Sequence, residues 1–379
     1  MHKEAEAPVR RAFSQQSDPA QAIDEIARSL ECDDLAGMIF FCSDAYDPSE
    51  ISEQLQARFS CPVVGCTTAG EIGEVYQRGG IVAVGFSSED FRMHVAPITD
   101  LGSFDATSAQ KLAERLHDDV AGGELDRERM FGLILLDGLS GCEEPVTALV
   151  QEVLGGVGLF GGSAGDNLRF EQTRVYFDGA FHTGAGVLVL LDTSLPFEIF
   201  QLQHFEPSED DLVITEADPS IRRVTEIDGG EAAEEYARLL EVDVDQLDPQ
   251  IFARYPVMLQ IGDEWYVRSI QRVNDDGSMD FFCAIDEGLP LTIARGVGFV
   301  PTLQAKVDEL VKKFGSIACT IGCDCVLRRL EIEQTGVQTE VENVLEPLKF
   351  VGFSTFGEQF GAIHVNQTLT GVVIGNRAA

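Results

Sequence analysis

The chain has 379 residues, of which 44% are hydrophobic and 24% charged, values that are ordinary for a globular protein of two or three domains. The charge is unusual, because 27 Lys and Arg stand against 64 Asp and Glu and give a formal net charge of −37. Such a surface repels phosphate backbones and anionic lipid, so we expect neither a nucleic-acid nor a membrane partner.

The chain contains no apolar run of about 18 residues and no secretory signal near its first residue. Its nine cysteines are odd in number and lie mostly in apolar runs. Both features predict a cytoplasmic protein whose thiols stay reduced.

Strands and helices alternate through the first half of the chain. Residues 1–16 are polar and charged, so we expect a flexible arm there. Asp18-Pro19 and Asp47-Pro48 each indicate a helix start, because Asp caps a helix and Pro suits its first position. The expected helices are 18–30, 47–59, 107–120 and 143–153, and the expected strands are 37–42, 61–66, 80–86, 91–98, 130–136, 173–177 and 184–191.

The second half is expected to begin within the segment 193–196, which ends in Pro196. This boundary divides the ordered chain into domains at 17–195 and 196–379. The expected strands are 197–205, 222–227, 255–261, 264–272, 279–284, 316–327 and 362–374, and the expected helices are 231–240, 301–314 and one long helix within 331–348. The pattern predicts an α+β or layered α/β fold, with two domains of mixed sheets flanked by helices.

A short glycine-rich motif occurs three times. Motif 1 is VGCTTAGE (64–71), motif 2 is FGGSAGD (160–166) and motif 3 is VGFSTFGE (351–358); each is followed by a glycine and an apolar run. We therefore expect one supersecondary unit to recur, with a turn that carries hydroxyls and a carboxylate. Thr67, Thr68 and Ser163, together with Asn366 and Thr368 further along the chain, are candidate ligand-binding residues, and we expect Thr67, Ser163 and Ser354 to line one cleft. Turn geometry alone is the alternative explanation of the motifs.

Three cysteines in the second half have the spacing C-x3-C-x-C. Cys319, Cys323 and Cys325 lack a second cluster with zinc-ligand spacing. A buried strand in which the three share one side is the expected structure.

With these motifs and elements assigned, the chain resembles the FIST family of sensory domains. The resemblance rests on segments that follow the family's order from its N-terminal to its C-terminal domain: VVGCTTAGE (63–71), LFGGSAGDN (159–167), the block 213–240, CVLR (325–328), FSTFGE (353–358) and NQTL (366–369). It covers nearly the whole chain. It implies a small-ligand input domain for signal transduction.

A stand-alone chain of this size is similar to the nitric-oxide-sensing haemoproteins of the family, which act on a partner histidine kinase. That narrower resemblance rests on length, on Phe41-Cys42-Ser43, on Tyr46 and on the segment 364–368. It implies a haem cofactor and a histidine kinase partner. A FIST receptor for another small molecule, such as an amino acid, is the alternative, and a homo-oligomer is one option that the sequence leaves open.

A haem needs an axial ligand in an apolar pocket. His204 shares its strand face with two apolar residues, whereas His364 heads a polar ladder that continues through Asn366 and Thr368. Both histidines are candidate haem and metal ligands, with His204 slightly favoured, and Cys66 is a third candidate. A core or hydrogen-bonding role is the alternative for each.

One motif in the sequence supports an enzyme hypothesis. Residues 161–165 match G-x-S-x-G, so a serine hydrolase that uses Ser163 is an alternative of another class. The elbow requires a strand, a turn and a helix, but a strand is expected after the motif. We therefore expect no enzymatic activity.

Overall fold

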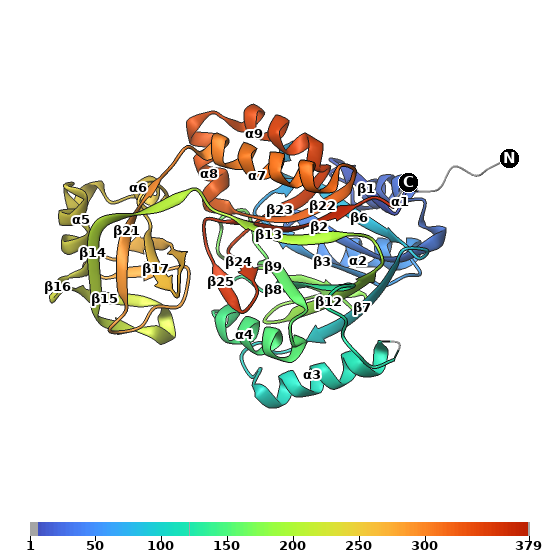
Figure 1. Cartoon of the computed structure of the whole chain (residues 1–379), viewed down its shortest axis with the longest axis horizontal. Helices are drawn as coiled ribbons and strands as arrows, with labels where there is room; N and C mark the ends of the chain where they lie inside the picture. Colours follow the sequence, from blue (N-terminus) through green and yellow to red (C-terminus); the bar gives the residue numbers. More distant parts are fainter. Residues whose placement is uncertain (1–6, 121, 378–379) are drawn as a thin grey trace.

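The computed structural model describes residues 7–120 and 122–377, and it contains three six-stranded mixed sheets, flanking helices and a separate module with a further sheet (Figure 1). This agrees with the predicted class of mixed sheets flanked by helices. Within the described residues, no helix is both long and apolar enough to cross a bilayer.

The first sheet is built by a β-α-β-α-β-β unit that we call repeat 1. It comprises β1 (Val9–Ser14), α1 (Pro19–Leu30), β2 (Leu35–Ser43), α2 (Pro48–Arg58), β3 (Val63–Thr68) and β6 (Ile81–Ser87). The strand order is β1-β6-β2-β3, and only β2 and β3 run parallel. Asp18 and Asp47 cap the two helices as expected, each accepting hydrogen bonds from first-turn amides.

The same unit occurs twice more. Repeat 2 comprises β7 (Phe91–Ile98), α3 (Ala106–Asp119), β8 (Met130–Leu136), α4 (Glu143–Leu154), β9 (Gly158–Ser163) and β12 (Gly186–Thr193). Repeat 3 comprises β13 (Phe197–Leu202), α7 (Phe299–Phe314), β22 (Ile317–Cys325), α8 (Val326–Thr335), α9 (Gln338–Leu345), β23 (Phe350–Thr355) and β26 (Leu369–Gly375). Their orders, β7-β12-β8-β9 and β13-β26-β22-β23, repeat that of the first unit, including the single parallel pair.

A hairpin from each repeat pairs with the edge strand of another repeat. In repeat 1 the hairpin is β4 (Glu71–Ile72) and β5 (Tyr76–Gln77), and β4 pairs with β23. In repeat 2 it is β10 (Val175–Phe177) and β11 (Ala180–His182), with β10 paired to β3, and in repeat 3 it is β24 (Glu358–Phe360) and β25 (Ile363–Val365), with β24 paired to β9. The exchange is cyclic and completes each of the three sheets of the repeats at six strands.

Repeat 3 is interrupted by the separate module. The module contains β14 (Phe205–Asp218), β15 (Arg223–Ile227), β16 (Gly230–Glu231), α5 (Ala232–Leu240), α6 (Pro249–Arg254), β17 (Val257–Ile261), β18 (Glu264–Arg268), β19 (Ile270–Val273), β20 (Met279–Phe281) and β21 (Pro290–Gly296). It lies beside the three-repeat body and has its own hydrophobic core (Figure 1). The chain enters and leaves the module at adjacent points, since the amide of Val297 donates to the carbonyl of His204 at 2.7 Å.

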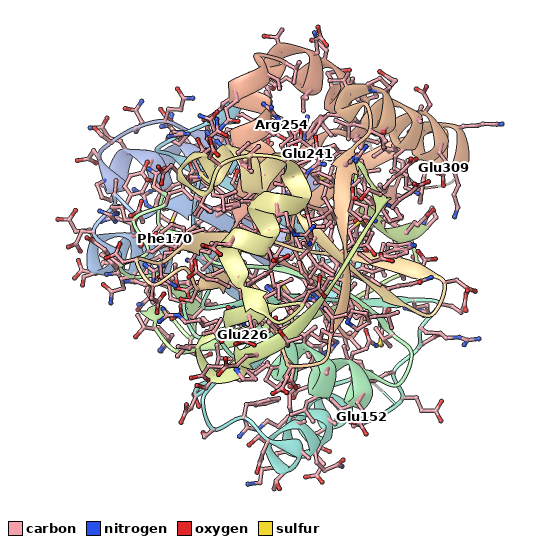
Figure 2. All side chains as sticks on the ribbon, turned by 90° about the vertical axis from the view of Figure 1, so that its left-hand side faces the viewer. Glu152, Phe170, Glu226, Glu241, Arg254 and Glu309 are labelled. Carbon is pink, nitrogen blue, oxygen red and sulfur yellow. The ribbon has the colours of Figure 1, made fainter. Side chains whose placement is uncertain are left out.

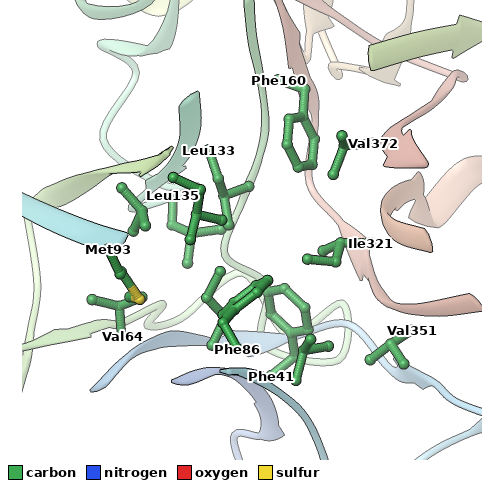
Figure 3. Packing of buried hydrophobic residues seen from close by; sticks show 14 of the residues in the cluster. Phe41, Val64, Phe86, Met93, Leu133, Leu135, Phe160, Ile321, Val351 and Val372 are labelled. Atoms are coloured by element: carbon green, nitrogen blue, oxygen red, sulfur yellow. The ribbon is translucent and has the colours of Figure 1, made fainter. Parts of the chain in front are cut away.

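The body is held together by one apolar core to which all three repeats contribute. Phe41 of repeat 1 stacks on Phe353 of repeat 3 at 4.3 Å between ring centroids. Phe160 of repeat 2 belongs to the same buried cluster (Figure 3). The three sheets therefore share one interior rather than forming independent domains.

Several sequence expectations need correction. Residues 9–14 are not part of an arm: they form β1, which pairs with β6 along its whole length, while 1–6 lie outside the described residues. The strand expected at 316–327 ends at Cys325, where α8 begins, and the long helix expected within 331–348 is broken at Gly336. The strands expected at 197–205, 264–272 and 362–374 are each split in two, and β14, α6 and β21 were not expected.

The boundary expected at 195/196 falls between repeats 2 and 3. Strands from before this boundary join a sheet formed after it, and the reverse also holds. Strands β4 and β5 join the sheet of repeat 3, and β24 and β25 join the sheet of repeat 2. The division at this point stays a prediction.

Candidate functional site

The three glycine-rich motifs meet at the centre of the body. The amide of Gly165 donates to the carbonyl of Thr67 at 3.0 Å, that of Ala69 to Ser354 at 2.9 Å, and that of Ser163 to Gly357 at 2.8 Å. The approach is so close that a Cβ on Gly165 would lie 2.6 Å from the backbone nitrogen of Ala69. The motifs thus converge, but as a closed junction of backbones and buried side chains rather than as the open cleft that we expected.

The candidate residues of motif 1 are hydrogen-bonded or buried within the protein. The hydroxyl of Thr67 accepts from the amide of Arg174 at 3.0 Å. Cys66 is fully buried in the shared core, and burial raises the pKa of its thiol well above the ordinary value. A neutral thiol surrounded by aliphatic side chains lacks both the charge and the access that a ligating or redox cysteine needs.

Motifs 1 and 3 each pair a threonine with a buried carboxyl group three residues later. Thr68 donates to Glu71 at 2.6 Å, and Thr355 donates to Glu358. Glu358 also accepts from the hydroxyl of Thr368 at 2.7 Å, so this predicted ligand-binding residue is already bonded. Burial raises the pKa of Glu71 to about 7 and that of Glu358 to about 8, and both groups are fully screened from solvent.

Motif 2 departs from this pattern. The carboxylate of Asp166 instead accepts from the amides of residues 170–172, and an apolar residue, Val175, occupies the strand position that Glu71 and Glu358 hold in the other hairpins. The hydroxyl of Ser163 is therefore left without a carboxyl partner in its own motif. It accepts from the side-chain amide of Gln359 at 2.9 Å.

The hairpin of repeat 3 differs from its two counterparts in one buried cross-strand pair. The equivalent pairs are Ile72 with Tyr76 and Tyr176 with Phe181, whereas repeat 3 has Gln359 with His364. The amide nitrogen of Gln359 lies 3.1 Å from Nδ1 of His364. Burial lowers the pKa of His364 to about 4, so the ring is neutral at physiological pH.

These residues belong to a group that we call the interface cluster, in which body and module meet. It consists of Ser163, Gln359, His364 and Asn366 from the body and Arg268 and Ser269 from the module. The guanidinium of Arg268 donates to the carbonyl of His364 at 3.1 Å, which joins the two parts. Seen from the module side, the module lies in front of this region (Figure 2).

The interface cluster is rich in polar atoms without a hydrogen-bond partner. Among the described residues, thirteen buried side-chain polar atoms lack one, and the cluster holds six of them: Arg268 Nε, Ser269 Oγ, Gln359 Oε1, His364 Nε2, Asn366 Nδ2 and Asn366 Oδ1. Each such atom costs about 1–3 kcal/mol unless something satisfies it. This concentration sets the interface cluster apart from the other buried regions of the described chain.

A glycine provides room beside two of these atoms. A Cβ on Gly357 would lie 2.6 Å from Nε2 of His364 and 3.1 Å from Nδ2 of Asn366. The absence of a side chain at this position lets both groups approach the motif junction.

The module is fastened to the body around the interface cluster. Arg222 of the module binds Glu143 at 2.5 Å and Glu144 at 2.6 Å, both at the start of α4. Gln367 of the body donates to the carbonyl of Ala253 in α6 at 3.3 Å. The cluster is therefore enclosed by an ion pair and by hydrogen bonds between the two parts.

His204 lies elsewhere, where the chain enters the module. Its Nε2 is 2.9 Å from Glu331 and its Nδ1 is 3.3 Å from the guanidinium of Arg328, so both ring nitrogens are engaged. It lines a cavity of about 510 Å³ whose wall also includes Arg254, Arg295 and other polar side chains.

The two histidines fit a haem unequally, and neither setting accommodates one as packed. His204 has no unengaged ring nitrogen. His364 has one in Nε2, but its Nδ1 faces the donor nitrogen of Gln359, whereas a proximal ligand donates its second N–H to an acceptor. The ring of His364 also packs directly against Gly357, and none of the cavities identified among the described residues includes it. No group of three potential metal ligands occurs in the described part of the chain.

The surroundings of Ser163 differ from those of a hydrolase nucleophile. Strand β9 ends at Ser163, and residues 164–174 contain no helix, so the strand–turn–helix elbow is not formed. The hydroxyl is bonded to Gln359 rather than to a histidine.

Sequence reasoning found Ser163, His364 and Asn366 but missed Arg268, Ser269 and Gln359. Gln359 follows Glu358 directly, where motif 1 has the apolar Ile72 after Glu71, and this difference was a signal that could have been used. Arg268 and Ser269 belong to no motif, and only the docking of the module brings them to the cluster.

In protein freed of bound small molecules, we expect Asn366→Leu to leave the free energy of unfolding unchanged or to raise it by up to about 1 kcal/mol, because the change removes two unpartnered buried polar atoms. The matched control is Thr368→Val, which breaks the bond to Glu358 and should lower the same quantity by about 1–3 kcal/mol. Urea unfolding of both variants at pH 7 checks this. A larger loss in Asn366→Leu than in Thr368→Val would mean that the amide is satisfied within the protein.

The raised pKa of Glu71 predicts a pH dependence of stability. Its native pKa of about 7 exceeds the ordinary 4.5, so the native state favours the protonated form, and this contribution is complete below pH 4.5 and lost as the pH rises through 7. Glu71→Gln keeps the group neutral, so its free energy of unfolding should gain about 2–3 kcal/mol relative to the unsubstituted protein between pH 5 and pH 8. Glu74→Gln, at an exposed position of the same hairpin, is the control for urea unfolding. Parallel pH profiles for Glu71→Gln and the unsubstituted protein would contradict the assignment.

Comparison with known families agrees with the arrangement of the chain. Residues 37–230 match the FIST N domain and residues 232–361 match the FIST C domain. The second match begins inside the module and ends in the hairpin of repeat 3. No curated protein matches the chain. Since the two matches together span most of the sequence, the chain belongs to the FIST family.

Proposed function

We propose that this protein is a FIST-type sensor that binds a small polar molecule at the interface cluster. FIST domains are sensory ligand-binding domains of signalling proteins. The observation that carries the proposal is the set of six buried polar atoms without partners, contributed by both the module and the body. A ligand with donors and acceptors would satisfy them, and sites of this kind favour the junction of two parts of a chain.

The same geometry suggests how occupancy is transmitted. A ligand held by residues of both parts stabilises the docked arrangement by its differential affinity for that arrangement. The module is joined to the body by two adjacent crossings near His204 and Val297, so its position can change without unfolding either part. In this proposal the signal leaves by contact with another protein in the cytoplasm, and a histidine kinase is the partner that the family resemblance favours.

Protein purified under native conditions should release a small polar molecule on denaturation, detectable by mass spectrometry. We expect Gln359→Leu and Asn366→Leu each to reduce the amount of that molecule per protein at least about tenfold, because each removes a hydrogen bond to it. Gln56→Leu, which changes an exposed glutamine on α2, is the control. Equal small-molecule content in all four proteins would contradict the proposed site.

A haem-based nitric oxide sensor that regulates a partner histidine kinase is the alternative. One observation favours it: Nε2 of the buried His364 has no hydrogen-bond partner. The close packing around the ring weighs against it, since haem would have to displace the hairpin or the module.

The visible spectrum tests the alternative. If haem binds, protein reconstituted with hemin should show a Soret band that His364→Ala abolishes or shifts and that His204→Ala leaves nearly unchanged. A folded protein that takes up no haem would reject the haem proposal and leave the small-molecule receptor. The reverse pattern for the two variants would move the axial ligand to His204.

A further inference from the structure

The buried arginines of this chain are paired with carboxylates, with one exception. Four arginines are at most 9% exposed: Arg10, Arg268, Arg328 and Arg329. Arg10 binds Asp34, Arg328 binds Asp324 and Arg329 binds Glu333, at 2.6–3.1 Å. Arg268 is 7% exposed and forms no ion pair with any described residue. In a chain with 64 acidic residues, this is a buried cation that no carboxylate contacts directly.

The groups that Arg268 contacts directly are neutral. Its Nη1 donates to the backbone carbonyl of His364, its guanidinium is bonded to the thiol of Cys283, and its Nε is without a partner of good geometry. The nearby thiol of Cys283 is fully buried, and burial raises its pKa, so it supplies no negative charge. The carboxylates closest to this region, Glu143 and Glu144, are bound to Arg222. An isolated buried guanidinium costs several kcal/mol, so it persists where a partner of opposite charge is supplied from outside the chain.

We infer that Arg268 is the specificity-determining residue of the interface cluster and that the ligand bound there carries a carboxylate. The inference rests on the proposed function and adds the ligand's charge to it. The buried Nε of the guanidinium has no partner, and arginine recognises carboxylates through paired donors of which Nε is one.

A monoanion suits the site better than a phosphate. A phosphate carries nearly two charges and more acceptor oxygens than one guanidinium can satisfy, and the remaining cluster groups are neutral. Ser269 beside Arg268 offers a hydroxyl, while Asn366 and Gln359 offer both donors and acceptors for the rest of the ligand. The cation comes from the module and the amides come from the body, so the ligand bridges the two parts.

Thermal unfolding with acetate as a minimal carboxylate probe tests the inference in the full-length protein. At equal ionic strength, sodium acetate should raise the Tm of the unsubstituted protein by about 2 °C more than sodium chloride does, and acetamide, its neutral analogue, should not. Arg268→Met should lose the acetate-specific shift, and Arg295→Gln, which changes an exposed module arginine paired with Asp210, should keep it. Arg268→Lys retains the charge without the planar fork and should keep a smaller shift, which guards against misfolding of the methionine variant.

An acetate-specific shift that is absent from the unsubstituted protein, or equal in Arg268→Met, overturns the inference. Its failure is separable from failure of the proposed function. If the molecule released from purified protein is neutral, and its amount depends on Asn366 but not on Arg268, the inference about the carboxylate is wrong and the proposed site is retained. If its amount depends on neither residue, both the inference and the proposed site are wrong.

Discussion

A strand at the edge of a sheet exposes backbone N–H and C=O groups that must be paired or covered. In each repeat of this protein that edge is the strand that ends in a glycine-rich motif: β3, β9 or β23. Each edge is closed by a hairpin from another repeat, so no repeat completes its sheet alone. The motif is the segment in which the chain leaves one sheet and enters the next, and all three motifs must therefore cross at the centre. Their glycines permit the close backbone approach that this crossing requires.

Near-symmetry makes the exceptions informative. In the hairpins of repeats 1 and 2, the buried cross-strand pair is apolar or aromatic and packs into the core, whereas Gln359 and His364 occupy it in repeat 3. Motif 2 lacks the threonine–carboxyl pair that the other motifs contain, and the hydroxyl of Ser163 accepts a hydrogen bond from Gln359 instead. The insertion of the module interrupts the same repeat that carries the polar pair. Three departures from the repeating pattern thus coincide at one place, which is the interface cluster.

Much of the body could be predicted from the sequence. The helices after Asp18 and Asp47 and the strands 91–98 and 130–136 lie within a residue or two of their expected positions, because caps and apolar runs are local signals. The recurrence of a unit around the motifs was also visible. The hairpin exchange was not, since which edge a hairpin joins depends on the packing of distant segments. Strand β14 was missed because acidic residues occupy much of it; it is an inner strand between β21 and β15, and most of those acidic residues lie at its solvent-exposed positions.

The site was half predictable for the same reason. Ser163, His364 and Asn366 stood in or beside a motif, but Arg268 acquires its role only when the module docks. His204 was favoured for its apolar strand neighbours, whereas Glu331 and Arg328 approach from a helix far away in the sequence and engage both ring nitrogens. A strand pattern shows which face a side chain occupies and not which polar groups meet it there.

The cyclic hairpin exchange also constrains the order of assembly on the ribosome. Hairpin β10–β11 can cover β3 once repeat 2 has emerged, but β4–β5 has to wait for β23, which begins at Phe350, and β9 has to wait for β24. Until nearly the whole chain is synthesised, an open sheet edge and an unattached hairpin remain exposed in the nascent protein. The ring closes only with its last segments, and before then the high negative charge of the chain is the main barrier to pairing between neighbouring nascent copies.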